Sequence, residues 1–317
     1  MSRIYEALQK AESERQAGRE APPIEQAAEP DPSFAGVAAD VAVETAPEWS
    51  AETLVEPAAM YEPLAVAGPA LDPAKIAKHH WEPLMERLPA TLERGAAVEQ
   101  FRSLRSRLFE LRDIKPLKAV LITSGMPQEG KSFIAANLAV SLARHKNSKV
   151  LLVDGDMRRY TLHEVLGCKH DPGLADYLAG RAEMMDVMQR ADLEVEEKNR
   201  LYALQNITFI PGGNGGDKAA DLSGNPRFGE LIRTASRYYD WIIVDSSPVL
   251  PVSDAVNLAR ACDGVLLVAR NGVTKYDVAQ RAQSELKASN ILGFVLNAAD
   301  NNSTSVNSYY GYDAKYA

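Results

Sequence analysis

The chain has 317 residues, 46% of them hydrophobic, which is enough apolar material for one large domain or two small ones. No stretch approaches the ~20 consecutive apolar residues that cross a bilayer, and the net charge of −8 gives no support for nucleic-acid binding. The two cysteines, Cys168 and Cys262, are far apart. This spacing excludes a disulfide framework and a structural metal site, and it favours a reducing compartment.

The N-terminal quarter is predicted to lie outside the globular domain. Residues 1–18 form a short helix candidate that Ser2 can cap, with apolar side chains at helical spacing. Residues 19–80 are predicted to be a disordered linker. Between residues 20 and 74 there are eleven acidic side chains, no basic one, and nine of the eighteen prolines. The like charges of such a segment repel one another, and it has too few apolar residues to form a core. The net negative charge of the chain therefore comes from this linker and not from the folded domain.

Residues 81–300 are predicted to form one α/β domain that begins with a helix over 92–112. After it, short apolar stretches alternate with helical ones. The predicted strands are Ala119–Thr123, Val150–Val153, Ile207–Ile210, Trp241–Val244, Val265–Ala269 and Gly293–Leu296, and the predicted helices are Ser132–Arg144, Pro226–Tyr238, Ser253–Ala261 and Lys275–Ser289. Strands that are apolar on both faces and alternate with helices predict a doubly wound, mostly parallel sheet covered on both sides.

A phosphate-binding loop follows the first of these strands. The pattern G-x-x-x-x-G-K-[ST] is met between an apolar strand and a helix, which is the context that this loop requires. Its backbone N–H groups and the helix N-terminus would bind the phosphates of ATP, with Lys131 as a mobile cation and Ser132 as a ligand of Mg²⁺. The predicted ATP-binding residues here are Gly125, Met126, Pro127, Gln128, Glu129, Gly130, Lys131, Ser132 and Phe133.

Acidic residues end two other predicted strands on the same side of the sheet. Asp154 and Asp156 follow the second strand, and Asp245 follows the fourth. Carboxylates at this edge, in register with a phosphate loop, can hold Mg²⁺ directly or through water. Asp154 and Asp156 would point to different sides, so one can face the metal and the other a substrate or a backbone cap. Arg158 either steadies charge near the phosphates or pairs with Asp156, and Asn297 lies near the nucleotide base or caps a turn.

With these motifs the chain resembles the bacterial tyrosine kinase family, a deviant-Walker branch of the P-loop proteins. The resemblance is carried by the phosphate loop, by Asp-x-Asp-x-Arg after the second strand, and by a strand ending in Asp-x-x-Pro. Two further elements are similar to the family's self-association motif E-x-x-R-x-x-R and to its C-terminal phosphorylation cluster. The first of these elements comprises Glu99, Arg102 and Arg105. The second lies within the tail 301–317 and comprises Tyr309, Tyr310, Tyr312 and Tyr316.

The resemblance implies an ATP- and Mg²⁺-dependent protein-tyrosine autokinase of the cytoplasmic, exopolysaccharide-associated type. It implies that Lys131 neutralises the transferred phosphoryl group and that either Asp154 or Asp156 accepts the tyrosine proton. The resemblance favours Asp154 as this base, with Asp156 assisting at the metal. Ser132 and Asp245 would complete the metal site, and Arg158 would contact ATP. The implied partners are other copies of the chain in a ring, and a separate inner-membrane activator that brings the kinase to the membrane. Asp245-Ser246-Ser247-Pro248 departs from the family's Asp-x-Pro-Pro, which puts the rigidity of that loop in question.

The tail predicts transfer between subunits. Asn301 and Tyr309 are eight residues apart, at most roughly 28 Å when extended, which favours a neighbouring active site over the chain's own. Each phosphotyrosine adds about −1.5 to −2 charges, so a fully modified tail would oppose docking, and the ring would come apart.

Two other functions share the phosphate motifs. A ParA/MinD-type positioning ATPase would hydrolyse ATP without modifying protein, but such ATPases have a lysine where this chain has Gly125, and they lack a tyrosine cluster. A non-catalytic, nucleotide-dependent scaffold of a polysaccharide-export complex is opposed by the intact Lys131, Asp154, Asp156 and Asp245.

Overall fold

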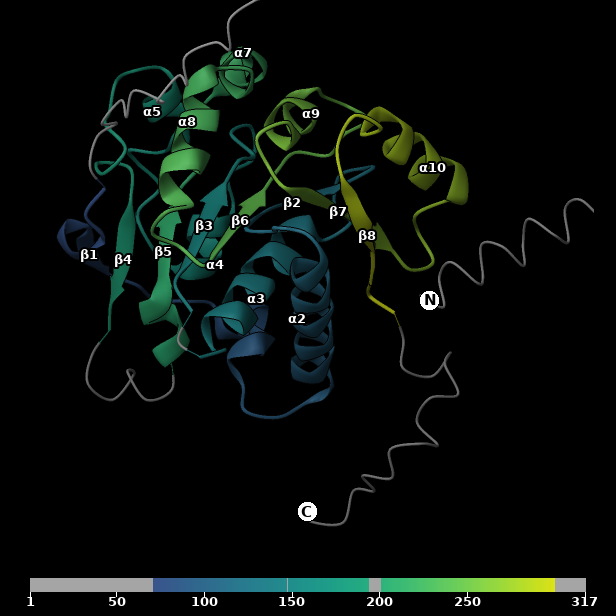
Figure 1. Ribbon diagram of the computed structural model, residues 1–317, viewed down its shortest axis with the longest axis horizontal. Coiled ribbons are helices and arrows are strands. Elements are labelled where there is room, and N and C mark those ends of the chain that lie inside the picture. Colours follow the sequence, from purple (N-terminus) through teal and green to yellow (C-terminus); the bar gives the residue numbers. More distant parts are fainter. Residues whose placement is uncertain (1–70, 147, 194–200, 300–317) are drawn as a thin grey trace, which may run out of the picture. The chain divides into compact units, whose positions relative to one another are not determined.

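The computed structural model describes residues 71–146, 148–193 and 201–299. An eight-stranded sheet runs through them in the order β1-β4-β5-β3-β6-β2-β7-β8 (Figure 1). The strands are β1 (Ala77–His80), β2 (Ala119–Ser124), β3 (Val150–Asp154), β4 (Gln189–Asp192), β5 (Ile207–Ile210), β6 (Trp241–Asp245), β7 (Gly264–Arg270) and β8 (Ile291–Asn297). The six strands from β5 to β8 in this order are mutually parallel, whereas β4 pairs antiparallel with β5 and parallel with β1.

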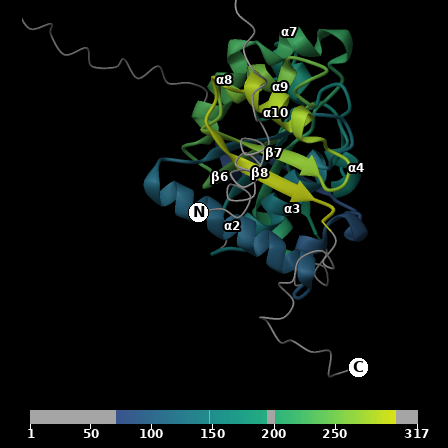
Figure 2. The same cartoon turned by 90° about the vertical axis from the view of Figure 1, so that its right-hand side faces the viewer.

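Helices cover both faces of the sheet, as the sequence predicts (Figures 1 and 2). They are α2 (Ala96–Ile114), α3 (Lys131–Ala143), α4 (Leu162–Leu166), α5 (Leu174–Leu178), α7 (Ala219–Ser223), α8 (Pro226–Ala235), α9 (Asp254–Ala259) and α10 (Tyr276–Glu285). Short 3₁₀ turns comprise η1 (Pro73–Lys75), η2 (Met85–Arg87), η3 (Pro89–Thr91), η4 (Tyr202–Asn206) and η5 (Gly216–Lys218).

Alternate residues of the central strands belong to two separate cores. Val120 and Ile122 of β2 pack with α2, α3 and α4, whereas Leu121 packs with α5, α8 and α9 on the other face. This two-sided burial explains why the central strands are almost entirely apolar before their carboxyl ends, with Thr208 of β5 as an exception. Asp154 and Asp245 stand at the carboxyl ends of β3 and β6, where the chain leaves the sheet.

The folded part begins earlier than the sequence predicts, so the linker boundary at residue 80 is wrong. Leu71 and Ile76 are buried in the core, and β1 pairs with β4 at the sheet edge. Both strands are polar at most positions, and neither shows the apolar pattern that identifies the central strands. β1 is the edge strand and buries little side-chain surface, whereas β4 lies between β1 and β5. The described fold thus includes residues 71–80, at the end of the predicted linker.

Replacing Ile76 with alanine tests this boundary. We expect the free energy of unfolding to fall by about 2–4 kcal/mol, because a buried isoleucine leaves a cavity. Lys78→Ala, at an exposed position of β1, should change it by less than about 0.5 kcal/mol. Denaturant titration measures the free energy of unfolding of both variants. Equal losses in the two would mean that residues 71–80 belong to the linker and not to the folded domain.

Candidate active site

The phosphate loop connects β2 to α3. Gly130 ends the loop with φ of 97°, in the left-handed region, and α3 starts at the next residue. The positive φ would strain any other residue at position 130, and a Cβ there would also displace the Asn297 side chain. Nδ2 of Asn297 donates a 2.9 Å hydrogen bond to the carbonyl oxygen of Glu129. The end of β8 therefore holds the loop from outside, and Asn297 contacts its backbone.

The Glu129 side chain holds the loop from inside. It is 2% exposed, and its Oε2 accepts a 2.8 Å hydrogen bond from the Met126 amide. Its Oε1 accepts a hydrogen bond from the Thr274 hydroxyl. In this structure the Met126 amide therefore donates to Glu129, and its predicted contact with the phosphates stays a prediction. Sequence analysis missed Thr274, which lies 145 positions away along the chain.

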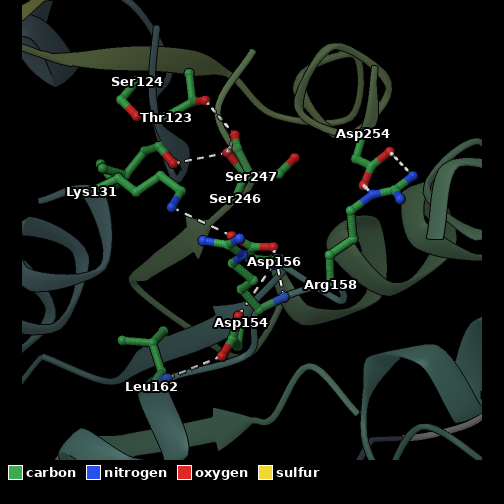
Figure 3. Close-up of polar contacts among 12 residues, drawn as sticks. Thr123, Ser124, Lys131, Asp154, Asp156, Arg158, Leu162, Ser246, Ser247 and Asp254 are labelled. Carbon is green, nitrogen blue, oxygen red and sulfur yellow. Dashed lines mark hydrogen bonds and ion pairs between the residues drawn. The ribbon is translucent and has the colours of Figure 1, made fainter. Parts of the chain in front are cut away.

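Lys131 and Asp156 face each other beneath the loop (Figure 3). Lys131 Nζ lies 3.4 Å from Asp156 Oδ2, and the two side chains are 12% and 4% exposed. The other oxygen of Asp156 accepts a hydrogen bond from the Arg159 amide. The pair comes from two neighbouring motifs, and it leaves the ammonium directed into the space below the loop.

Asp154 points the other way, as its spacing from Asp156 predicts. Its two oxygens accept 3.2 Å hydrogen bonds from the amides of Asp156 and Leu162. The carboxylate therefore fixes the turn after β3 and the start of α4. Burial, and next the charge of Asp245, raise the pKa of Asp154 well above its usual value.

Asp245 lies beside Asp154, because the register of β3 and β6 pairs these two residues. Both carboxylate oxygens are buried, and neither accepts a hydrogen bond of good geometry within the described residues. Burial raises the pKa of Asp245 to about 6, although the Lys131 charge and the nearby Ser132 hydroxyl favour the ionised form. Three buried carboxylates against one lysine leave a local excess of negative charge. This donor set fits Mg²⁺, which prefers one or two carboxylates together with nucleotide phosphates.

The loop after β6 is fixed without the family's paired prolines. Ser246 and Ser247 are buried. The Ser246 hydroxyl donates to the Ile122 carbonyl at 3.0 Å, and the Thr123 hydroxyl donates to the Ser247 carbonyl at 2.8 Å. Hydrogen bonds to β2 thus supply the rigidity that the sequence left in question.

Two side chains of the predicted ATP-binding set contact other elements of the fold in this structure. The Phe133 ring packs on Phe101 of α2, with ring centroids 5.9 Å apart. Arg158 pairs with Asp254 at the start of α9, at 2.7 Å between Nε and Oδ2, and it does not pair with Asp156 (Figure 3). Asp254 is 1% exposed at its side chain, so the structure shows a partner that sequence spacing could not identify.

Arg158→Ala tests whether this pair is structural. It would leave the Asp254 carboxylate buried and unpaired, so we expect a loss of about 2–3 kcal/mol in the free energy of unfolding. The double variant Arg158→Ala/Asp254→Ala should regain part of that stability, since it no longer contains the buried, unpaired carboxylate. Thermal and denaturant unfolding measure the cycle. An Arg158→Ala variant of unchanged stability but weak ATP binding would instead assign Arg158 to the nucleotide.

The motif residues Glu99, Arg102 and Arg105 lie on α2. Arg102 pairs with Glu99, and Arg105 Nη1 donates to the Ser141 carbonyl of α3 at 2.8 Å. Tyr309, Tyr310, Tyr312 and Tyr316 lie outside the described residues, as does the predicted N-terminal helix. Among the residues described, no helix has the length and apolar character to cross a bilayer.

Comparison with known proteins identifies the family. Residues 120–312 match the CobQ/CobB/MinD/ParA nucleotide binding domain. The tyrosine-protein kinase YwqD of Bacillus subtilis is 33% identical over 215 residues, which are 67% of this chain and 86% of the relative. The chain belongs to the bacterial tyrosine kinase family.

Further members of the bacterial tyrosine kinase family agree in sequence and in fold. The tyrosine-protein kinase wzc of Salmonella typhimurium is 33% identical over 223 residues, covering 69% of this chain but only 29% of the relative. The kinase domain of the Escherichia coli tyrosine kinase ETK superposes with a TM-score of 0.60 at 29% identity, covering 72% of this chain and 85% of that one. The chain thus spans less than a third of the length of the Salmonella kinase.

Proposed function

We propose that this protein is a protein-tyrosine autokinase that transfers the γ-phosphoryl group of ATP to tyrosines of its own tail. The observation that carries the proposal is the meeting of Lys131, Asp156 and Asp245 beneath a phosphate loop, in a chain whose relatives are tyrosine kinases. Phosphoryl transfer needs positioning and charge neutralisation more than covalent chemistry, and this site offers both.

The nucleotide would lie on the loop and on the N-terminus of α3. The remaining free amides of Gln128 to Gly130 and the Lys131 ammonium would neutralise the phosphates. Ser132, Asp245 and Asp156 would hold Mg²⁺, which supplies charge neutralisation when it is bound. The buried, hydrogen-bond-free oxygens of Asp245 support this assignment.

Asp154 is the proposed proton acceptor for the substrate tyrosine. A phenol with a pKa near 10 needs such a base at neutral pH. Asp156 is already paired with Lys131 on the nucleotide side, which leaves Asp154 as the carboxylate beside it that is not paired with the lysine. Each of its oxygens accepts one amide hydrogen bond, from Asp156 or Leu162, and keeps a lone pair that can accept the proton.

The acceptors are Tyr309, Tyr310, Tyr312 and Tyr316 of a second copy, which Glu99, Arg102 and Arg105 would help to bring into a ring. Two of the relatives are the putative tyrosine-protein kinases EpsB and AmsA. By analogy we place the protein in exopolysaccharide biosynthesis and export. It would be cytoplasmic and would reach the membrane through a separate activator.

A ParA/MinD-type ATPase shares the nucleotide-binding domain and is the alternative. The lysine that such ATPases place at the start of the loop is absent, since Gly125 stands there. The tyrosine-rich tail also has no use in that mechanism.

A mixing experiment tests both the activity and its direction. One partner is Lys131→Met with an intact tail, and the other is the active chain with Tyr309, Tyr310, Tyr312 and Tyr316 all changed to phenylalanine. With Mg·ATP and an activator, we expect anti-phosphotyrosine signal on the Lys131→Met chain only when both are present. Signal on the wild type alone but never in the mixture would show transfer within one chain, and ATP hydrolysis without any signal would favour the ATPase.

A further inference from the structure

A cavity of about 210 Å³ lies at the far end of α3 from the phosphate loop. The helix has 13 residues, so the two ends are about 20 Å apart. Arg102 and Arg105 of α2, Arg144 and Lys146 after α3, and Tyr202 of η4 line the cavity. We call it the basic cavity. It is separate from the proposed ATP site, but Arg102 and Arg105 also belong to the proposed self-association motif, whereas Arg144, Lys146 and Tyr202 do not.

Backbone carbonyls hold two of its guanidinium groups in place. Arg105 Nη1 donates to the Ser141 carbonyl at 2.8 Å. Arg144 Nη1 donates to the Ala90 carbonyl at 2.8 Å and also to the Leu92 carbonyl. Within the described residues, Nη2 of either arginine has no acceptor. These donors are therefore preorganised and still available to a ligand.

Positive charge in the basic cavity exceeds what its own acidic residues neutralise. Four cationic side chains line it, and the one carboxylate bonded to any of them in the described structure is that of Glu99, on Arg102. Burial, followed by the charges of Arg102 and Arg144, lowers the pKa of Arg105. An anion in the cavity would relieve this repulsion.

An aromatic ring lies beside the cations. The Arg144 guanidinium lies over the Tyr202 ring, 5.8 Å from its centroid, and its Nε is 3.4 Å from the Tyr202 hydroxyl. A ligand that carries both a negative group and an aromatic ring could bond to the guanidinium groups and pack against Tyr202.

We propose that the basic cavity binds a phosphotyrosine side chain. A phosphomonoester has three acceptor oxygens and about −1.5 to −2 charges, which matches several converging cations better than a single carboxylate does. The proposal rests on the proposed function, because that reaction makes the phosphotyrosine of the tail. The site would bind the product away from the place where it is made.

Peptide binding to the full-length protein tests the proposal. The probes are a synthetic peptide of residues 307–317 phosphorylated at Tyr312, its unphosphorylated twin, and inorganic phosphate, measured by calorimetry with saturating ADP present. We expect only the phosphopeptide to bind tightly. Arg102→Gln and Lys146→Gln should each weaken it roughly tenfold or more, because each loses a charge-assisted contact.

Arg107→Gln is the matched control. Arg107 lies on the same helix and pairs with Glu110, as Arg102 pairs with Glu99, but it does not line the cavity. This variant should bind the phosphopeptide like the wild type. Arg105 and Arg144 are left intact because they support the backbone.

Several outcomes would overturn the proposal: no binding, equal binding of the two peptides, or unchanged affinity in both cavity variants. If inorganic phosphate binds as tightly as the phosphopeptide, the aromatic ring of the phosphotyrosine contributes nothing to binding in the cavity. The peptide is synthetic, so the result does not depend on catalysis. Binding without autophosphorylation would count against the kinase proposal alone, and autophosphorylation without binding would count against the cavity alone.

Discussion

Asp245→Asn is expected to make the nucleotide-free protein more stable and almost inactive. Burial raises the pKa of this carboxyl from 3.8 to about 6. The folded state therefore holds the proton more tightly than the unfolded state, and stability falls as pH rises from about 4 through 6. Above that range the ionised carboxylate costs roughly 1–3 kcal/mol, which asparagine removes.

The same change removes a proposed ligand of Mg²⁺. We expect the rate of phosphotyrosine formation to fall roughly 100-fold or more. Mg·ATP should raise the melting temperature of the wild type but not that of the variant, since ligand that binds only the folded state stabilises it. A trade of stability against activity at one residue is typical of a functional site.

Asp240→Asn is the control for this experiment. Asp240 precedes β6 at the opposite end of the same strand, where its carboxylate accepts a hydrogen bond from the Lys149 amide. That variant should keep its activity. Unfolding at pH 8 and at about pH 4 gives the comparison: the stabilisation by Asp245→Asn should appear at pH 8 and vanish at pH 4. An Asp245→Asn protein that is less stable at pH 8, or fully active, would contradict the assignment.

Lys131→Met should abolish detectable phosphoryl transfer. The ammonium is the one cation within 4 Å of the acidic residues beneath the loop in the described structure. We expect a loss of roughly 100- to 1,000-fold in rate, the usual effect of removing one group that stabilises transition-state charge. The variant should also be less stable than the wild type at neutral pH, because Asp156 and Asp245 lose a compensating charge.

Lys287→Met provides the comparison for Lys131→Met. Lys287 is exposed beyond α10 and makes no salt bridge in the described structure. It should match the wild type in rate and stability. Quantitative anti-phosphotyrosine measurements over time would compare the three proteins. Wild-type phosphorylation by Lys131→Met would mean that the reaction uses another group.

The order of the central elements could be predicted because each has a strong local signal. The six predicted strands all occur, and their bounds shift by at most two residues. The phosphate loop could be predicted because its spacing and its strand–helix context are both local. Asp154 and Asp245 could be placed together because parallel strands bring their carboxyl ends to one edge.

The contacts that position these groups could not be predicted. Glu129 with Thr274 and Arg158 with Asp254 join residues about 100 or more positions apart, and either partner alone looks like an ordinary polar residue. The sequence does not predict β1, at the sheet edge, or β4 beside it, because their residues lack apolar periodicity and their order comes from strand pairing. The helix over 92–112 begins later, at Ala96, after Gly95 with φ of 137°.

The most direct test of the central claim is the mass of the full-length protein after incubation with Mg·ATP and an activator. We predict phosphate on Tyr309, Tyr310, Tyr312 or Tyr316 in the wild type, located by peptide fragmentation, and none in Lys131→Met. ATP turned over to ADP while all four tyrosines stay unmodified would contradict the account.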